Sequence, residues 1–127
     1  MFEITVQTIF SAAHALTVAG IKKPIHGHNW HVKATLAGDN LDDDGLLCDF
    51  HTVESSLQAI VADFNNQNLN DHPAFRENNP SAERVAGYIA DELIQRVEPT
   101  LAPHARLTSV SVSESPGCVA TYRPPSA

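Results

Sequence analysis

The sequence predicts an α+β domain, in which a four-stranded antiparallel sheet carries two helices packed on one face. Strand-like segments occur in pairs at the two ends of the chain, and two amphipathic helical segments lie between them. This segregation is typical of α+β folds, because parallel sheets alternate strands with helices. The 127 residues suffice for one hydrophobic core, so we expect a single domain over residues 1–127.

The first half of the sheet is predicted to be a pair of strands. Residues 2–10 alternate between apolar and polar side chains, as a half-buried strand does. Residues 17–25 contain Gly20 and Pro24 and are predicted to be a loop. A second strand is expected from about His26 to Leu36, and it ends at the turn-rich sequence GDNLDDDG, residues 38–45.

Two helices are predicted next. Asp49 suits the N-cap of the first. Its apolar positions recur at helical spacing: Phe50, Val53, Leu57, Ile60, Val61 and Phe64. The second helix begins near NPSAE, where Asn79 or Ser81 can cap it and Pro80 suits the first turn. Its buried face is predicted to comprise Val85, Ala86, Ile89, Ala90, Leu93, Ile94 and Val97. We expect Pro99 and Pro103 to close it.

The chain ends in a second predicted strand pair. Residues 107–113 alternate again, with Val110 and Val112 on one face. The sequence SPG makes a tight turn, and residues 118–122 return as the last strand.

Composition excludes several classes of protein. The net charge is −7 and the eight Lys and Arg residues are scattered, which argues against a nucleic-acid surface. No apolar run approaches the ~20 residues that span a bilayer, and MFEITVQTIF lacks the pattern of a signal peptide. The surroundings of Cys48 and Cys118 favour two reduced, buried thiols. We therefore expect a cytoplasmic protein that binds neither membrane nor nucleic acid.

Histidines are concentrated in PIHGHNWHV, residues 24–32. His26 and His28 point to the same side of a strand, and His14 lies at the end of the preceding strand. A hairpin across residues 15–25 would bring the three together, and three histidines with an open fourth position are typical of catalytic zinc. The alternative is that His26 and His28 are polar surface residues. His31 has the opposite parity and is predicted to face solvent.

Several motifs together carry a family resemblance that covers nearly the whole chain. They are FSAAHAL (10–16), HGHNWHV (26–32), GLLCDF (45–50), LND (69–71), NPSAE (79–83) and VSVSESPGCVATY (110–122). In this order they resemble the 6-pyruvoyltetrahydropterin synthase and 6-carboxytetrahydropterin synthase family. The resemblance implies the tunnelling fold, and trimers stacked into hexamers with active sites at subunit boundaries.

The resemblance also implies site residues. The zinc (Zn²⁺) ligands of the family correspond to His14, His26 and His28. Glu114 corresponds to the glutamate that holds the guanidine-like edge of the pterin, where a carboxylate can accept two parallel N–H bonds. Glu83 matches a second position near the pterin, and it equally suits a first-turn acid that the helix dipole favours.

The family's proton-transfer groups are absent. Lys22 stands where the best-known members have a catalytic Cys, and Asn65 and Asn66 replace their Asp-His pair. Neither amide titrates near neutral pH. Lys22 could act as the base, bind a phosphate, or be a solvated loop residue. Cys48 is predicted to be buried and not to replace the missing thiol. His51 and His72 have no motif support.

The expected function is that of a zinc-dependent lyase acting on the side chain of dihydroneopterin triphosphate or a related dihydropterin. One alternative is a non-catalytic or altered-function homologue that binds zinc and pterin. Another is an aldolase-type cleavage of dihydroneopterin. The residues are equally compatible with the queuosine, biopterin and folate-like pathways.

Overall fold

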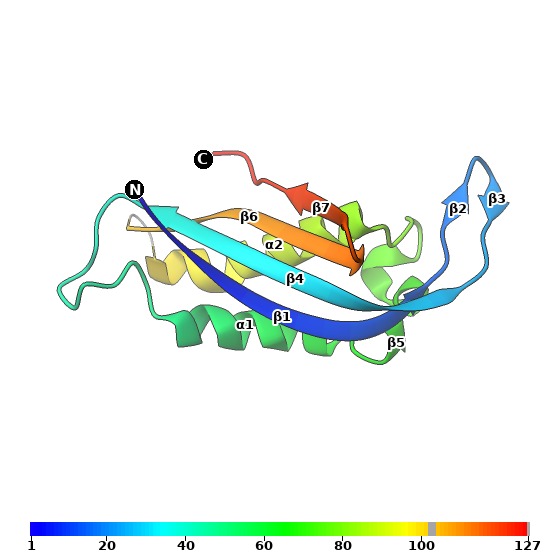
Figure 1. Ribbon diagram of the computed structural model, residues 1–127, viewed down its shortest axis with the longest axis horizontal. Coiled ribbons are helices and arrows are strands. Elements are labelled where there is room, and N and C mark those ends of the chain that lie inside the picture. The colour runs from blue at the N-terminus through cyan, green and yellow to red at the C-terminus, as the bar shows by residue number, and fades with distance from the viewer. Residues whose placement is uncertain (102–103, 127) are drawn as a thin grey trace.

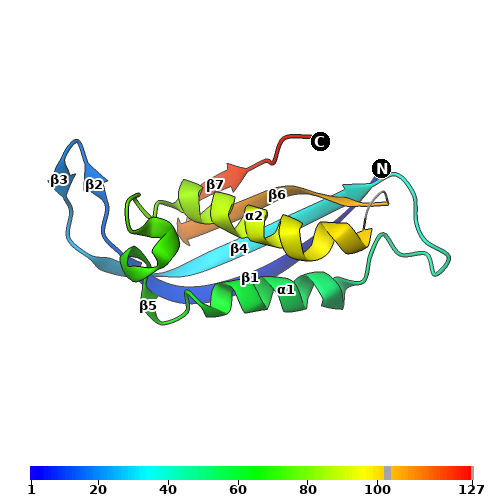
Figure 2. The ribbon, with the colours of Figure 1, turned by 180° about the vertical axis from the view of Figure 1, so that it is seen from behind.

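Four long strands form an antiparallel sheet, and two helices cover one of its faces (Figures 1 and 2). The computed structural model describes residues 1–101 and 104–126. The strands, in their order across the sheet, are β1 (Phe2–His14), β4 (His26–Gly38), β6 (Arg106–Ser115) and β7 (Cys118–Tyr122). The helices are α1 (Phe50–Ala62) and α2 (Ala82–Leu101). The predicted α+β class and its helix-covered antiparallel sheet are confirmed.

Short elements complete the fold and correct the prediction of a plain loop at residues 17–25. This segment contains β2 (Thr17–Val18) and β3 (Ile21–Lys22), a small hairpin that projects beyond the end of the main sheet (Figure 1). A fifth strand, β5 (Gln67–Asn68), pairs in parallel with β1. Two 3₁₀ turns, η1 (Leu69–Asp71) and η2 (Pro73–Phe75), connect β5 to α2.

The α1 N-cap is Asp49, as predicted, since its carboxylate accepts from the backbone N–H of His51 at 2.9 Å. The predicted apolar face of α1 is buried except for Phe50, which is 54 % exposed in the first turn. For α2, Ser81 is the cap, because its hydroxyl accepts from the N–H of Arg84 at 3.2 Å. Pro80 precedes this cap instead of lying in the first turn.

The prediction that Pro99 closes α2 is wrong, because the helix continues through it to Leu101. Pro99 removes the N–H that would bond the carbonyl of Gln95, and because only two helical residues follow it the disruption is confined to the last turn. The hydroxyl of Thr100 also donates to the carbonyl of Val97 at 2.7 Å, which satisfies one carbonyl of the last turn. Pro103 lies outside the described residues.

The core lies between the sheet and the helices. Trp30 lies at the end of the core that adjoins the three histidines. Its ring is fully buried and stacks on Phe10 with a centroid distance of 5.7 Å. Its indole N–H donates to the carbonyl of Ala12 at 3.1 Å, so the ring has its polar partner. It packs against the imidazole of His14 in a T-shaped arrangement, with a centroid distance of 4.9 Å. Neither helix of the described chain has the length and apolarity to cross a membrane.

The two cysteines are both free, but only one is buried as predicted. Cys48 packs into the core, and burial, helped by neighbouring Asp49, raises the pKa of its thiol. A raised pKa keeps the thiol protonated and unreactive. Cys118 is exposed, because it begins the edge strand β7 directly after the turn at Gly117.

Asparagine side chains bind the outer edge of β1 where its continuation has no strand beside it. The amide of Asn70 accepts from the N–H of Ala15 and donates to the carbonyl of Ala15, both at 2.8 Å. The amide of Asn79 does the same for Thr17, also at 2.8 Å. Each amide therefore replaces one residue of a neighbouring strand. This explains why Asn79 does not cap α2.

Replacing Asn70 with aspartate should destabilise the fold. Asn70→Asp keeps an acceptor for the Ala15 N–H but sets a carboxylate oxygen against the Ala15 carbonyl, which loses its donor. We expect the free energy of unfolding to fall by about 1–3 kcal/mol, measured by urea denaturation at pH 7. Asn78→Asp, at an exposed neighbouring position with the same charge change, is the control. Equal stability of the two variants would contradict the role given to Asn70.

Candidate metal centre

The pairing of β1 with β4 brings three histidines together at one end of the sheet. His14 lies opposite His26 in the register, and Ala12 lies opposite His28. All three share the helix-facing side, because their positions have equal parity on antiparallel strands. One ring nitrogen from each lies within 4.8 Å of the others. The predicted convergence of His14, His26 and His28 is confirmed.

Backbone carbonyls fix the tautomers of two of these histidines. His14 is fully buried, and its Nδ1 lies 2.7 Å from the carbonyl oxygen of Pro80. The Nδ1 of His26 lies 3.1 Å from the carbonyl oxygen of Pro24. Because a carbonyl only accepts, each Nδ1 carries a proton, and in the neutral ring the lone pair is on Nε2. Such outer hydrogen bonds are typical of metal-ligating histidines.

The lone pairs lack partners in the protein. Within residues 1–101 and 104–126, His14 Nε2 and His28 Nε2 are buried without a hydrogen-bond partner. The pKa of His28 is lowered mainly by burial; Glu114 opposes this effect, and His26 and His14 add to it. A lowered pKa keeps the imidazole neutral, with its lone pair available near neutral pH.

Glu114 stands against the cluster. Its Oε2 lies 3.1 Å from His14 Nε2, and neither atom has a hydrogen-bond partner in the described chain. The side chain is 27 % exposed. A carboxylate oxygen and an imidazole lone pair repel each other unless a cation lies nearby. The site is therefore built to hold positive charge.

These residues fit a zinc ion. Three neutral imidazoles form the donor set of catalytic zinc sites that keep a fourth position open. Trp30 shields the buried side of the cluster through its edge contact with His14. The unpartnered Nε2 atoms of His14 and His28 are the positions from which such an ion would be bound.

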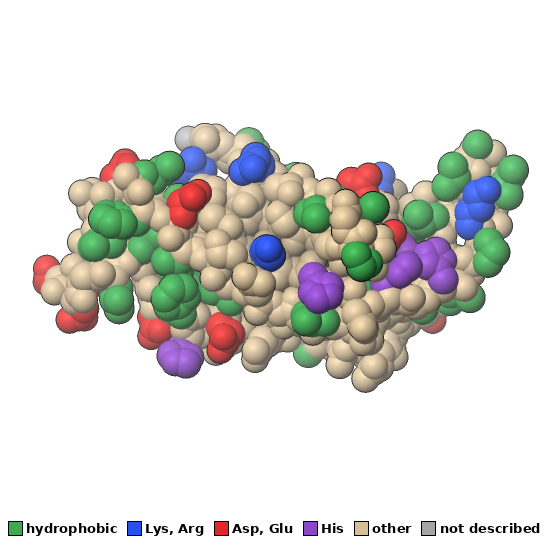
Figure 3. Space-filling view, in the orientation of Figure 1, with side chains coloured by type: hydrophobic (Ala, Val, Ile, Leu, Met, Phe, Trp, Pro, Cys, Tyr) green, Lys and Arg blue, Asp and Glu red, His purple; other side chains and the backbone are tan. Residues whose placement is uncertain are grey.

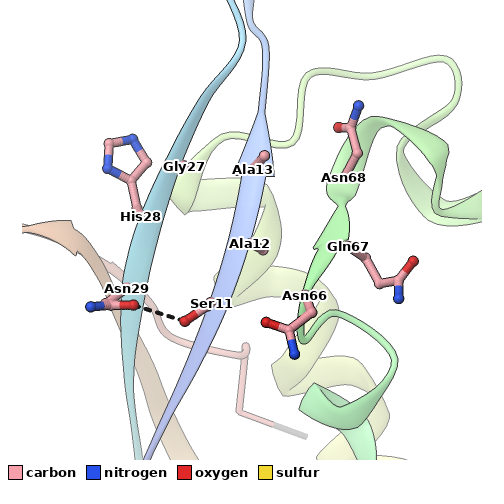
Figure 4. A pocket seen from close by; sticks show the side chains of 9 residues that line it. All are labelled: Ser11, Ala12, Ala13, Gly27, His28, Asn29, Asn66, Gln67 and Asn68. Carbon is pink, nitrogen blue, oxygen red and sulfur yellow. Dashed lines mark hydrogen bonds between the residues drawn. The ribbon is translucent and has the colours of Figure 1, made fainter.

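Two cavities meet at His28. The larger, about 880 Å³, has the metal candidate His28 and the acid Glu114 in its wall. Its other lining residues are Gln7, Gly27, Asn29, His31, Lys33, Ser111, Ser113, Ser115, Pro116 and Val119. The smaller, about 660 Å³, lies over β1, β4 and β5 (Figure 4). It is lined by Ser11, Ala12, Ala13, Gly27, His28, Asn29, Asn66, Gln67 and Asn68.

Asn65 and Asn66, which replace the expected proton-shuttling pair, bind the edge of β1. Asn65 Oδ1 accepts from the N–H of Ser11 at 3.0 Å. The backbone N–H of Asn66 donates to the carbonyl of Ser11 at 2.6 Å. Asn66 has a φ of 60°, a conformation that asparagine tolerates better than most residues. Both residues therefore hold the segment after α1 against the edge of β1. Asn66 also lines the smaller cavity beside His28.

Two other predicted site residues do not lie in the cavities that contain His28. Lys22 is exposed on β3 and lines a separate cavity of about 530 Å³ with Asn70 and Asp71. Glu83 is exposed in the first turn of α2, where the helix dipole favours an acid.

Two solvent-facing residues of β4 line the larger cavity, and the sequence pattern did not predict this. His31 is exposed and outside the histidine cluster, as predicted, yet it lines the larger cavity with Lys33. Their shared parity on β4 was the available signal. His51 is exposed on α1, and His72 packs on Phe64 at a centroid distance of 5.0 Å.

Comparisons with known proteins agree with this architecture. The model of the 6-pyruvoyl tetrahydropterin synthase family matches residues 3–125. The 6-carboxy-5,6,7,8-tetrahydropterin synthase of Bacillus subtilis is 33 % identical over 129 residues, which cover 97 % of this chain and 86 % of that protein.

Solved structures confirm the tunnelling fold. The 6-pyruvoyltetrahydropterin synthase of Plasmodium vivax superimposes with a TM-score of 0.81 at 22 % identity, covering 97 % of both chains. The 6-pyruvoyl tetrahydropterin synthase of Caenorhabditis elegans superimposes with a TM-score of 0.78 at 23 % identity, covering 98 % of both. The family match extends over nearly the whole chain, and this protein belongs to the 6-pyruvoyl tetrahydropterin synthase family.

Proposed function

We propose that this protein is a zinc-dependent lyase of the 6-pyruvoyl- or 6-carboxytetrahydropterin synthase type. Its substrate would be dihydroneopterin triphosphate or a related dihydropterin, altered in its side chain. One observation carries the proposal. Lone pairs of a histidine triad lie beside Glu114, and His28 and Glu114 line a cavity large enough for a pterin.

The residues divide the work between the two ends of the substrate. Glu114 accepts hydrogen bonds from the N–H groups of the pterin ring and fixes its orientation. His14, His26 and His28 hold the zinc, which supplies Lewis-acid polarisation of side-chain oxygens when bound. Burial of His14 and the edge of Trp30 exclude water from the inner side of the triad. Glu83 is proposed as a second pterin contact.

The base that removes the side-chain proton is proposed to be Lys22, in place of the family's cysteine. In Plasmodium vivax 6-pyruvoyltetrahydropterin synthase a glutamate is named as a catalytic residue. Members of the fold thus use different residue types for catalysis.

A second candidate function is a zinc- and pterin-binding homologue without turnover. Asn65 and Asn66 favour it, because both are engaged with Ser11 and neither titrates. It predicts that pterins stabilise the protein but are not consumed. Aldolase-type cleavage of dihydroneopterin is the remaining variant of the lyase proposal.

Assembly and location complete the proposal. We propose a homo-oligomer, a trimer or hexamer, in the cytoplasm. The edge strand β7 and the sheet face opposite the helices offer surfaces for such contacts (Figure 1). Light scattering of the purified protein measures the oligomeric state.

Zinc binding should depend on the triad. We expect about one zinc per chain in the metal-loaded protein. His26→Ala removes an exposed ligand without opening the core, so it should lower zinc affinity more than about 100-fold, since even outer-shell changes cost 10–100-fold. Competition with a chelator measures the affinity. His51→Ala, at an exposed helical position, is the control. A zinc affinity of His26→Ala equal to that of His51→Ala would remove the metal proposal.

Turnover should depend on Lys22, the proposed base. The zinc-loaded protein should consume dihydroneopterin triphosphate, with the products separated by chromatography. Lys22→Met should lower kcat about 100-fold or more, since a general base contributes about 10²–10⁴-fold. Lys23→Met, with the same charge change one residue away, should leave kcat unchanged. If the wild type binds pterins but consumes none, the non-catalytic alternative holds. If Lys22→Met remains fully active, Lys22 is not the base.

Replacing Glu114 should lower pterin affinity without changing the zinc content. Glu114→Gln keeps the size of the side chain but removes the charge that pairs with the ring N–H groups. We expect pterin affinity to fall by about 10–100-fold, measured by pterin fluorescence, with unchanged zinc content. Glu83→Gln is measured beside it, and a similar loss would establish Glu83 as a pterin contact. Undiminished affinity in Glu114→Gln would refute the assigned anchor.

A further inference from the structure

The hairpin of β2 and β3 connects the two strands that carry the candidate metal ligands, and it is attached to the molecule only at its base. Every residue from 17 to 25 is exposed, so the core does not hold the hairpin. Figure 3 shows hydrophobic and basic side chains on this projecting hairpin and histidine side chains at its base. The position of the hairpin, which carries Lys22, therefore depends on the hydrogen bonds at its base.

Asn79 binds the first arm of this hairpin. Its side chain accepts from the N–H of Thr17 and donates to the carbonyl of Thr17, both at 2.8 Å. Thr17 lies opposite Lys22 in the register of β2 and β3. The hairpin is closed below this point by the N–H of Lys23, which donates to the carbonyl of Leu16 at 2.8 Å. Asn79 thus fixes the backbone directly across from Lys22.

The two residues after Asn79 connect it to a candidate metal ligand. The carbonyl oxygen of Pro80 accepts from His14 Nδ1 at 2.7 Å, and both residues are buried. Ser81 caps α2, because its hydroxyl accepts from the N–H of Arg84 at 3.2 Å. Pro80 therefore lies between two residues whose side chains are fixed, and its ring restricts its own φ. The orientation of the His14 ring depends on Asn79 from one side and on α2 from the other.

His26 has a similar arrangement on the neighbouring strand. Its Nδ1 lies 3.1 Å from the carbonyl oxygen of Pro24, which directly follows Lys23 at the closure of the hairpin. The outer hydrogen bonds of two candidate ligands thus both end on residues that adjoin the attachment of the hairpin. Such bonds orient the imidazole ring and its ligating lone pair. A change at the base of the hairpin should therefore reach the metal centre, and fixing the rings should in turn stiffen the hairpin.

We infer that Asn79 is a positioning residue for the metal centre. Through Pro80 it orients the ring of His14. Through Thr17 it holds the hairpin that carries Lys22. The inference deepens the proposed function, and it rests on that function for the roles of zinc and of Lys22. One amide then couples the metal ligands to the segment that carries the proposed base.

The test replaces Asn79 with alanine, which removes both hydrogen bonds to Thr17 without a change of charge. In the wild type, NMR of isotope-labelled histidine should show a protected Nδ1–H for His14, because this proton is buried and hydrogen-bonded. In Asn79→Ala the signal should be lost through exchange with water, and the amides of residues 17–23 should exchange faster. Zinc affinity, measured by competition with a chelator, should fall about tenfold or more, since changes outside the ligand shell cost 10–100-fold.

Asn70→Ala is the matched control, because it removes the same pair of hydrogen bonds, in this case from Ala15. It should lower the stability of the protein as Asn79→Ala does, but it should leave the His14 signal and the zinc affinity close to those of the wild type. If Asn79→Ala does not fold, Asn79→Asp, which keeps the acceptor for the Thr17 N–H, is measured in the same way. An unchanged His14 signal in the folded Asn79 variant, or equal losses in Asn70→Ala, would overturn the inference.

The NMR measurement separates this inference from the proposed function, because it needs no metal. If Asn79→Ala loses the His14 signal while even the wild type binds no zinc, the positioning role stands and the proposed function fails. If the wild type and Asn79→Ala bind zinc equally well and both keep the His14 signal, the proposed function stands and the positioning role is wrong.

Discussion

The register between β1 and β4 is the constraint on which the rest of the site depends. Thirteen residue pairs run from Phe2 opposite Gly38 to His14 opposite His26. Side chains alternate along a strand, so a slip by one residue would turn His26 and His28 to the opposite face and leave His14 buried without them. The apolar positions that face the helices therefore set the position of the three histidines. Trp30 belongs to both the core and the histidine cluster, because its ring is buried in the core and also contacts His14.

The outer edge of β1 shows what Asn65 and Asn66 do in the fold. Asn65 and Asn66 stand at the expected proton-shuttling positions, and both bind Ser11. Asn70 and Asn79 extend this support along the strand to Thr17. An amide can donate and accept at once, so it replaces a missing strand better than a carboxylate or an imidazole does. The polar segment that precedes α2 thus holds His14 in place from outside the sheet.

The two ends of the larger cavity differ in charge. At one end, the Nε2 atoms of His14 and His28 have no hydrogen-bond partner in the described chain and lie with the carboxylate of Glu114, an arrangement that favours a bound cation. At the other end, Lys33 and His31 face a surface with few acids and many hydroxyl and amide groups. The overall negative charge of the chain leaves these local fields intact.

The sequence by itself determined the four main strands, the two helices, the Asp49 cap, the parity of the histidines and the family, because periodicity and motifs are local properties of the chain. Only the tertiary structure decided that Ser81 caps α2 while Asn79 binds the backbone of Thr17. It also decided that Cys118 is exposed, that Lys22 lies in another cavity than His28, and that Lys33 shares one with Glu114. These facts depend on where β6 ends and on how the hairpin projects. Such contacts join segments far apart in the chain, and no local pattern encodes them.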